Sequence, residues 1–124
     1  MYRFYNPNPL NKFVGDCVIR AICKATGDSW DNTYDGVCYV GKELKDMPSS
    51  NTVWGTYLRQ KGFRRHTIPN TCPDCYSIKD FCRDNPQGIF VLCCDGHVVT
   101  AMHGNYYDAY DSGDEVPYYY FSEV

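Results

Sequence analysis

Cys17 occupies a position in which a cysteine could act as a nucleophile. It directly precedes an apolar stripe with helical spacing that runs from Val18 to Ala25 and ends at Gly27. The unpaired amides and the dipole at a helix N-terminus favour the thiolate, which is the nucleophilic form of cysteine. The neighbouring Asp16 has the opposite effect because its negative charge disfavours a second anion. Activation of Cys17 therefore requires a basic or cationic partner.

His97 is the partner that the sequence indicates. It follows the turn dipeptide Asp95-Gly96 and opens a strand pattern that ends at Met102. At the start of a strand an imidazole can stand at the rim of the sheet, where it can meet a side chain from another element. We therefore expect His97 to be the base that accepts the proton of Cys17.

An acid on the following strand could orient the His97 ring. A three-residue loop at 103–105 would place His97 opposite Asp111, and directly opposed residues share a face of a sheet. We expect Asp111 to hold the imidazole in one tautomer and to support the ion pair, with Asp108 as the alternative if the register differs.

These segments resemble the papain-like cysteine peptidases of the compact bacterial kind. The resemblance rests on Gly15-Asp16-Cys17 at a helix start, Gly96-His97-Val98-Val99 at a strand start, and Tyr107 to Ser112 on the next strand. The bacteriocin-processing, double-glycine peptidases are similar, and so, over most of the chain, are small uncharacterised phage or prophage proteins. The resemblance implies a papain-like fold and cleavage of an amide bond in a peptide or protein substrate through an acyl-enzyme, without a cofactor.

The resemblance also implies an oxyanion hole. In the papain-like pattern a Gln six residues before the cysteine acts together with the backbone amide of the nucleophile. Asn11 occupies that position here, and Asn8 and Asn6 are weaker substitutes. Donors of this kind are commonly worth ~3 kcal/mol each.

Two other functions are compatible with the same residues. An amine could intercept the acyl-enzyme in place of water, which would make the chain an acyltransferase or transamidase. A phage-encoded protein could instead use the fold as a scaffold to bind and modulate a host protein, since a fold alone does not determine a function.

The elements that must position these residues are helices first and strands second. Helical patterns run from Cys17 to Thr26, from Trp30 towards Leu44, from the cap at Ser50 to a stop at Gly62, and from the cap at Ser77 through Cys82. Strand patterns cover 63–68, 89–94, 97–102, 106–110 and 116–121, and the last four predict an antiparallel meander. We expect one α+β domain over 1–124, with N-terminal helices packed on a C-terminal antiparallel β-sheet.

The composition is that of a globular chain and argues against a nucleic-acid or membrane partner. Hydrophobic residues make up 44% and charged residues 22%, with a net charge of -3, whereas a phosphate backbone demands a basic surface. The basic cluster at 64–66 is short, and we expect it to be a solvated strand end. No stretch approaches membrane-spanning length and the first residues do not form a signal peptide, so we expect a cytoplasmic protein, in the bacterial host if phage-encoded.

Most of the eight cysteines are expected to be reduced thiols in the core. Cys72 and Cys75 have the spacing of half a zinc site, but no second pair follows at matching spacing. We expect a loop there that binds no metal, and no disulfide that is needed for folding.

Overall fold

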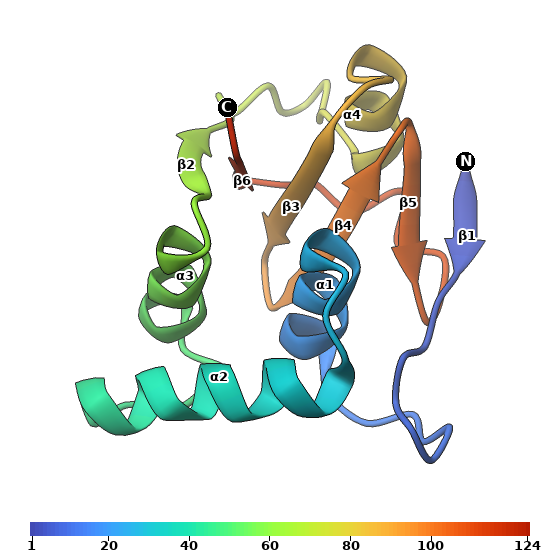
Figure 1. Cartoon of the computed structure of the whole chain (residues 1–124). Helices are drawn as coiled ribbons and strands as arrows, with labels where there is room; N and C mark the ends of the chain where they lie inside the picture. The colour runs from blue at the N-terminus through green and yellow to red at the C-terminus, as the bar shows by residue number, and fades with distance from the viewer.

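The computed structural model describes residues 1–124 and contains four helices and one six-stranded sheet (Figure 1). The helices are α1 (Cys17–Thr26), α2 (Trp30–Leu44), α3 (Asn51–Gln60) and α4 (Ile78–Asp84). The strands are β1 (Tyr2–Phe4), β2 (Arg64–Thr67), β3 (Ile89–Cys94), β4 (His97–Met102), β5 (Asn105–Asp108) and β6 (Tyr119–Ser122). The predicted α+β class is confirmed.

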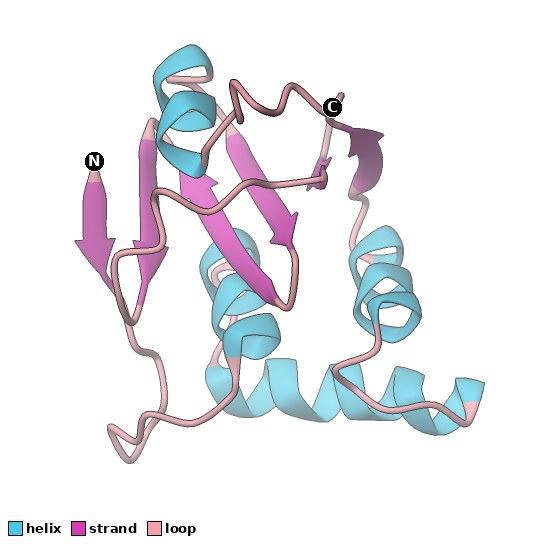
Figure 2. Ribbon diagram, turned by 180° about the vertical axis from the view of Figure 1, so that it is seen from behind, coloured by secondary structure: helices cyan, strands magenta, loops and turns pink.

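The sheet has the strand order β1-β5-β4-β3-β6-β2 and is mixed, because β1 runs parallel to β5 while the other pairs are antiparallel. The prediction of a C-terminal antiparallel sheet is therefore wrong in two respects. β1, from the N-terminal end of the chain, forms one edge and runs parallel to β5, and β6 leaves the meander to pair with β3 and β2. Figure 2 shows the connection from β5 to β6 crossing one face of the sheet.

The interior position of β6 follows from its side chains. Phe121 contacts the buried Trp54 of α3 on one face of the sheet, at a ring-centroid distance of 5.6 Å. Tyr120 packs against Phe81 of α4 on the other face, at 5.1 Å. A strand that is apolar on both faces is buried best between two other strands.

Helices cover both faces of the sheet. The first three helices share a core with Val91 and Cys93 of β3, whereas α4 packs with Leu92 and Cys94 of the same strand. This alternation is the two-residue period of a β-strand. The α1 helix lies over β4 (Figure 1), and the buried hydroxyl of Thr100 donates a hydrogen bond to the Ala21 carbonyl at 2.5 Å. None of the four helices has the combination of length and apolar character that a membrane crossing requires.

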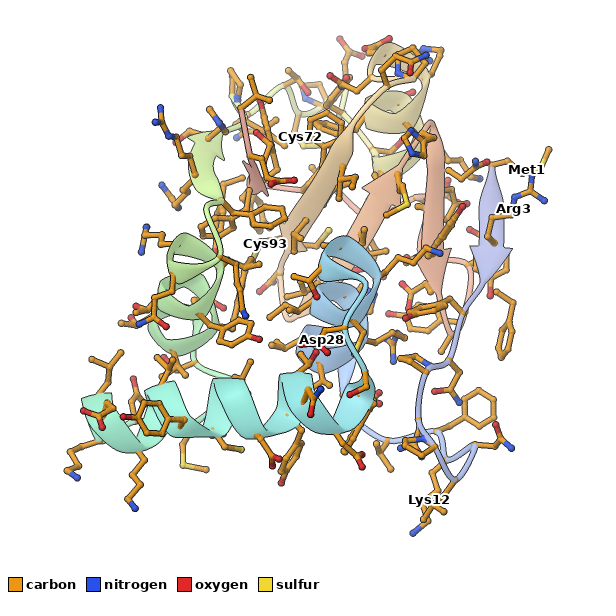
Figure 3. The ribbon with its side chains drawn as sticks, in the orientation of Figure 1. Met1, Arg3, Lys12, Asp28, Cys72 and Cys93 are labelled. Carbon is orange, nitrogen blue, oxygen red and sulfur yellow. A yellow bond between two sulfur atoms is a disulfide. The ribbon has the colours of Figure 1, made fainter.

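Cys72 and Cys75 form a disulfide with each other in the exposed loop between β2 and α4 (Figure 3). This disulfide was not predicted from the sequence, which indicated a plain loop at these two positions. The two intervening residues allow the Cα atoms to approach to 4.1 Å, close enough for the sulfurs to bond. The other six cysteines are free thiols.

Serine caps begin two of the helices. Ser29 accepts a hydrogen bond from the Asn32 amide at the start of α2, and Ser77 forms a capping box with Asp80 at the start of α4. Ser50 occupies the same position before α3, but its side chain makes no capping hydrogen bond. The hydroxyl of Ser50 instead donates to Asp46 on the surface.

Ser29→Ala is expected to lower the free energy of unfolding by about 1 kcal/mol, because it leaves a helix amide without its acceptor. Ser50→Ala is the matched control and should cost clearly less. Urea unfolding followed by circular dichroism measures both. Equal losses for the two variants would contradict the assignment of the Ser29 side chain as a cap.

Candidate active site

Cys17 and His97 come from different elements and lie side by side, although 80 positions separate them. Cys17 is half-buried at the first position of α1, and His97 is buried at the first position of β4. Each side chain shifts the pKa of the other, which places the thiol and the imidazole within interacting range. The packing of α1 on β4 thus brings together the two residues that the sequence singles out.

The environment favours the ionised forms of both residues. Burial raises the pKa of the Cys17 thiol, but hydrogen bonds from His97 and from the Val98 amide, together with the His97 charge, outweigh it and leave the pKa below its ordinary value. For His97, burial lowers the pKa, but the hydrogen bonds and charges of Asp108 and Cys17 raise it to about 9. Both shifts favour a thiolate at Cys17 and an imidazolium at His97.

Asp108 is the acid that holds the His97 ring. Its Oδ2 atom lies 2.6 Å from Nε2 of His97 and accepts a hydrogen bond from the Ser112 hydroxyl at 2.5 Å. Its Oδ1 atom accepts from Arg20 at 2.9 Å and from the Ala109 amide at 2.8 Å. Burial raises the pKa of Asp108, but these donors, His97 first, hold it below the usual range. A fully buried carboxylate with four donors remains charged and fixed in orientation.

Asp111, the acid expected opposite His97, does not contact it. Its exposed carboxylate accepts hydrogen bonds from the Tyr106 hydroxyl and the Gly113 amide. The alternative acid, Asp108, occupies the place beside His97 instead.

The difference arises from the length of the hairpin loop. Met102 pairs with Asn105, so the loop between β4 and β5 has two residues instead of the expected three. The two loop residues, His103 and Gly104, have φ angles of 52° and 80°, the combination that a tight hairpin turn requires. The shift moves the register by one residue, and β5 ends at Asp108, well before Asp111.

Arg20 joins the acid beside Cys17 to the acid beside His97. Its guanidinium donates to Asp16 Oδ1 at 2.8 Å and to Asp108 Oδ1 at 2.9 Å, and its side chain is 6% exposed. The Trp30 indole donates to the other oxygen of Asp16 at 2.9 Å. The charge of Asp16 is thus paired and does not oppose the Cys17 thiolate, whereas the charge of Arg20 lowers the pKa of that thiol. This corrects the role expected for Asp16.

Arg20 was not singled out as a site residue from the sequence. The available signal was its position four residues after Asp16, a spacing at which opposite charges meet on one helix face. Its second partner, Asp108, lies 88 positions away and could be identified only from the fold.

Asn11 does not take the position expected of an oxyanion-hole donor. It is exposed, has a left-handed φ of 56°, and does not line the pocket beside Cys17. Asn6 and Asn8 bond to Lys12 and Leu10 instead and shape the loop that Asn11 belongs to. The backbone amide of Cys17, in the first turn of α1, has no acceptor within the helix and is the donor that the structure leaves for an oxyanion.

A pocket of about 570 Å³ opens beside Cys17 and His97. We call it the Cys17 pocket. Trp30 and Tyr34 of α2, stacked at 5.0 Å between ring centroids, form part of its wall. Its other lining residues come from α1, α3, the segments before these two helices and the β3–β4 hairpin, and include Val14, Pro48, Asn51, Trp54, Cys93 and Val98.

Comparisons with protein-family models, curated proteins and solved structures find no match for this chain. The structure contains no group of three or more His, Cys, Asp or Glu side chains arranged to hold a metal ion.

Arg20→Met should destabilise the fold by about 3–5 kcal/mol, because it leaves two buried carboxylates without their shared cation. Arg83→Met is the matched control. Arg83 also pairs with two carboxylates, Asp80 and Asp84, but its side chain is 67% exposed, so the loss should stay below about 1 kcal/mol. Denaturant unfolding measures both variants, and similar losses would contradict the buried role of Arg20.

Asp108→Asn should destabilise the fold by about 3 kcal/mol and return the pKa of His97 towards its ordinary value, because His97 and Arg20 lose a buried counter-charge. Asp111→Asn removes an exposed carboxylate and should cost about 1 kcal/mol or less. The pKa of His97, followed by NMR, separates an effect on the site from general destabilisation. If Asp108→Asn left the pKa of His97 unchanged and Asp111→Asn shifted it, then Asp111 and not Asp108 would be the acid that holds the His97 ring.

Proposed function

We propose that the chain is a papain-like thiol hydrolase that cleaves an amide bond of a peptide or protein. The observation that carries the proposal is the arrangement around His97: Nε2 of its ring bonds to Asp108 at 2.6 Å, and the ring lies beside Cys17, so that each of these two residues shifts the pKa of the other. The order Cys, His, Asp along the chain agrees with the family resemblance of the sequence.

The first half of the reaction forms an acyl-enzyme. The Cys17 thiolate attacks the amide carbonyl carbon, and the carbonyl electrons move to oxygen to give a tetrahedral oxyanion. The backbone amide of Cys17 donates to that oxygen. The His97 imidazolium then gives its proton to the leaving amine, the carbon–nitrogen bond breaks, and the acyl group stays on sulfur as a thioester.

The second half releases the acyl group. His97, now neutral, removes a proton from a water molecule, which attacks the thioester and releases a carboxylic acid. Asp108 acts as a positioning residue: it holds Nε2 and stabilises the positive charge each time the ring is protonated. Arg20 and Ser112 in turn fix the Asp108 carboxylate.

Alkylation of Cys17 by iodoacetamide tests this proposal. At pH 6.5 Cys17 should react at least about tenfold faster than an ordinary thiol of pKa ~8.5, because His97 stabilises its thiolate. His97→Ala should shift the alkylation profile to higher pH, since burial then acts without the compensating charge. Mass mapping follows each cysteine separately, so that Cys38 on α2 provides an internal comparison.

His66→Ala, a change at another histidine, should leave the profile of Cys17 unchanged. A Cys17 that reacts as an ordinary thiol across pH, with or without His97, would contradict the proposal and favour a binding scaffold.

A further inference from the structure

One segment of this acidic chain has a net positive charge. Residues 47–73 contain no Asp or Glu and four of the chain's 12 Lys and Arg residues, although the net charge is -3. This segment forms α3 and β2, which lie next to each other at one end of the sheet (Figure 1). An acidic protein with a local cationic surface favours one orientation of a charged ligand.

Two of these cations line a shallow groove of about 310 Å³. We call it the arginine groove; it is lined by Asn51, Thr52, Arg59, Arg65, Tyr119 and Phe121. The Arg65 guanidinium lies over the Tyr119 ring at 4.1 Å, and that of Arg59 lies over Phe121 at 5.7 Å. The groove contains no acidic residue, and neither arginine takes part in an ion pair. Both guanidinium groups are thus held in place with free donors.

The absence of a side chain at Gly55 lets α3 pack closely against Phe121 of β6 beside the groove. A Cβ atom there would lie 3.3 Å from the Phe121 ring and 3.9 Å from a nitrogen of Arg59. Any larger side chain on this face of α3 would occupy the space between the helix and β6.

The arginine groove is a neighbour of the Cys17 pocket. Asn51 lines both, and Trp54 of the pocket stacks on Tyr119 of the groove at 6.3 Å and 11°. Cys93, a residue of the pocket wall that Figure 3 labels, and Arg65 of the groove both influence the pKa of the Tyr119 hydroxyl, so Tyr119 lies between the two sites.

We propose that the arginine groove binds an acidic segment of the substrate, a few residues from the bond that is cleaved. This proposal rests on the proposed function for its link to cleavage. Arginine forks pair with carboxylates in two-point hydrogen bonds, which recognise both charge and geometry. The substrate class is therefore a peptide with an apolar residue for the Cys17 pocket and Asp or Glu residues for the groove.

A protective role for the basic edge strand accounts for only part of this arrangement. Charged residues on an edge strand prevent pairing with other sheets, and Arg64 on β2 serves that purpose. Arg59 lies on a helix, however, and the guanidinium of Arg65 stacks on Tyr119 instead of extending from the edge. These two residues converge on one groove from different elements, which edge protection does not require.

Binding of labelled peptides to the Cys17→Ala protein tests the groove without requiring catalysis. The probes are fluorescein-labelled octapeptides with four leucines and four glutamates, in both orders, and the same peptides with glutamine in place of glutamate. Fluorescence anisotropy should show that the better glutamate peptide binds about fivefold more tightly than its glutamine version, the magnitude that two exposed ion pairs provide. The preference should weaken as salt is added.

The double variant Arg59→Gln/Arg65→Gln should lose the preference for glutamate. Arg64→Gln is the matched control: it changes the charge on the same strand, but adjacent side chains of a strand point to opposite faces, and Arg64 does not line the groove. Equal binding of the glutamate and glutamine peptides, or an equal loss in Arg64→Gln, would overturn the proposal.

Protection of Cys17 tests the link between groove and pocket. In the protein with Cys17 intact, a saturating glutamate octapeptide should slow alkylation by iodoacetamide at least about threefold, because the bound peptide spans both sites. Tight binding without protection would show that the groove serves another purpose and would overturn its role in substrate binding. The alkylation profile without peptide reports separately on the proposed function, so the two failures are distinguishable.

Discussion

The buried guanidinium of Arg20 is the contact on which the rest of the site depends. It bonds at once to Asp16, which precedes α1, and to Asp108, which ends β5. The first bond pairs the negative charge of Asp16, which would otherwise oppose a thiolate at Cys17. The second holds the carboxylate that orients His97. One side chain of α1 thus links the element that carries the nucleophile to the strand that carries the orienting acid.

The site places several charges where water is scarce, and this requires complete hydrogen bonding. Two ions taken out of water are stable together only when their remaining donors and acceptors are also satisfied. Trp30 completes the shell of Asp16, and Ser112 and the Ala109 amide complete that of Asp108. The site is consequently a single network, and removal of one member leaves another buried and unpaired.

The ionisation of the site also sets how stability depends on pH. The raised pKa of His97 alone would contribute stability below 6.5 and lose it as the pH rises through about 9. The lowered pKa of Cys17 has the opposite sign. The contributions of the two groups to the pH dependence of stability therefore partly offset each other. The lowered pKa of Asp108 contributes stability that is lost as the pH falls through that value.

Local patterns in the sequence predicted the structural features that are determined by residues close together in the chain. The helix that starts at Cys17, the strand that starts at His97 and the cap at Ser29 are each encoded within about a dozen residues. The errors concern choices that the whole fold decides. The β4–β5 loop has two residues instead of three, with a positive φ at His103, and this change of register brings Asp108 instead of Asp111 to His97. Strand β6 has apolar side chains on both faces and pairs with β3 instead of β5. The ion pair between Arg20 and Asp108 could not be predicted either, because 88 positions separate the two residues.

The charge state of His97 is the most direct test of this account. Nitrogen-15 NMR of the imidazole ring distinguishes a ring with both nitrogens protonated from a neutral tautomer, and it can be followed through a pH titration of the intact chain. If Cys17 and His97 form an ion pair, the ring should be an imidazolium at pH 7 and should lose its proton near pH 9. The same resonance should shift in Cys17→Ala. A neutral His97 ring at pH 7, which titrates near 6.5 and does not respond to Cys17, would contradict the ion pair and with it the proposed activity.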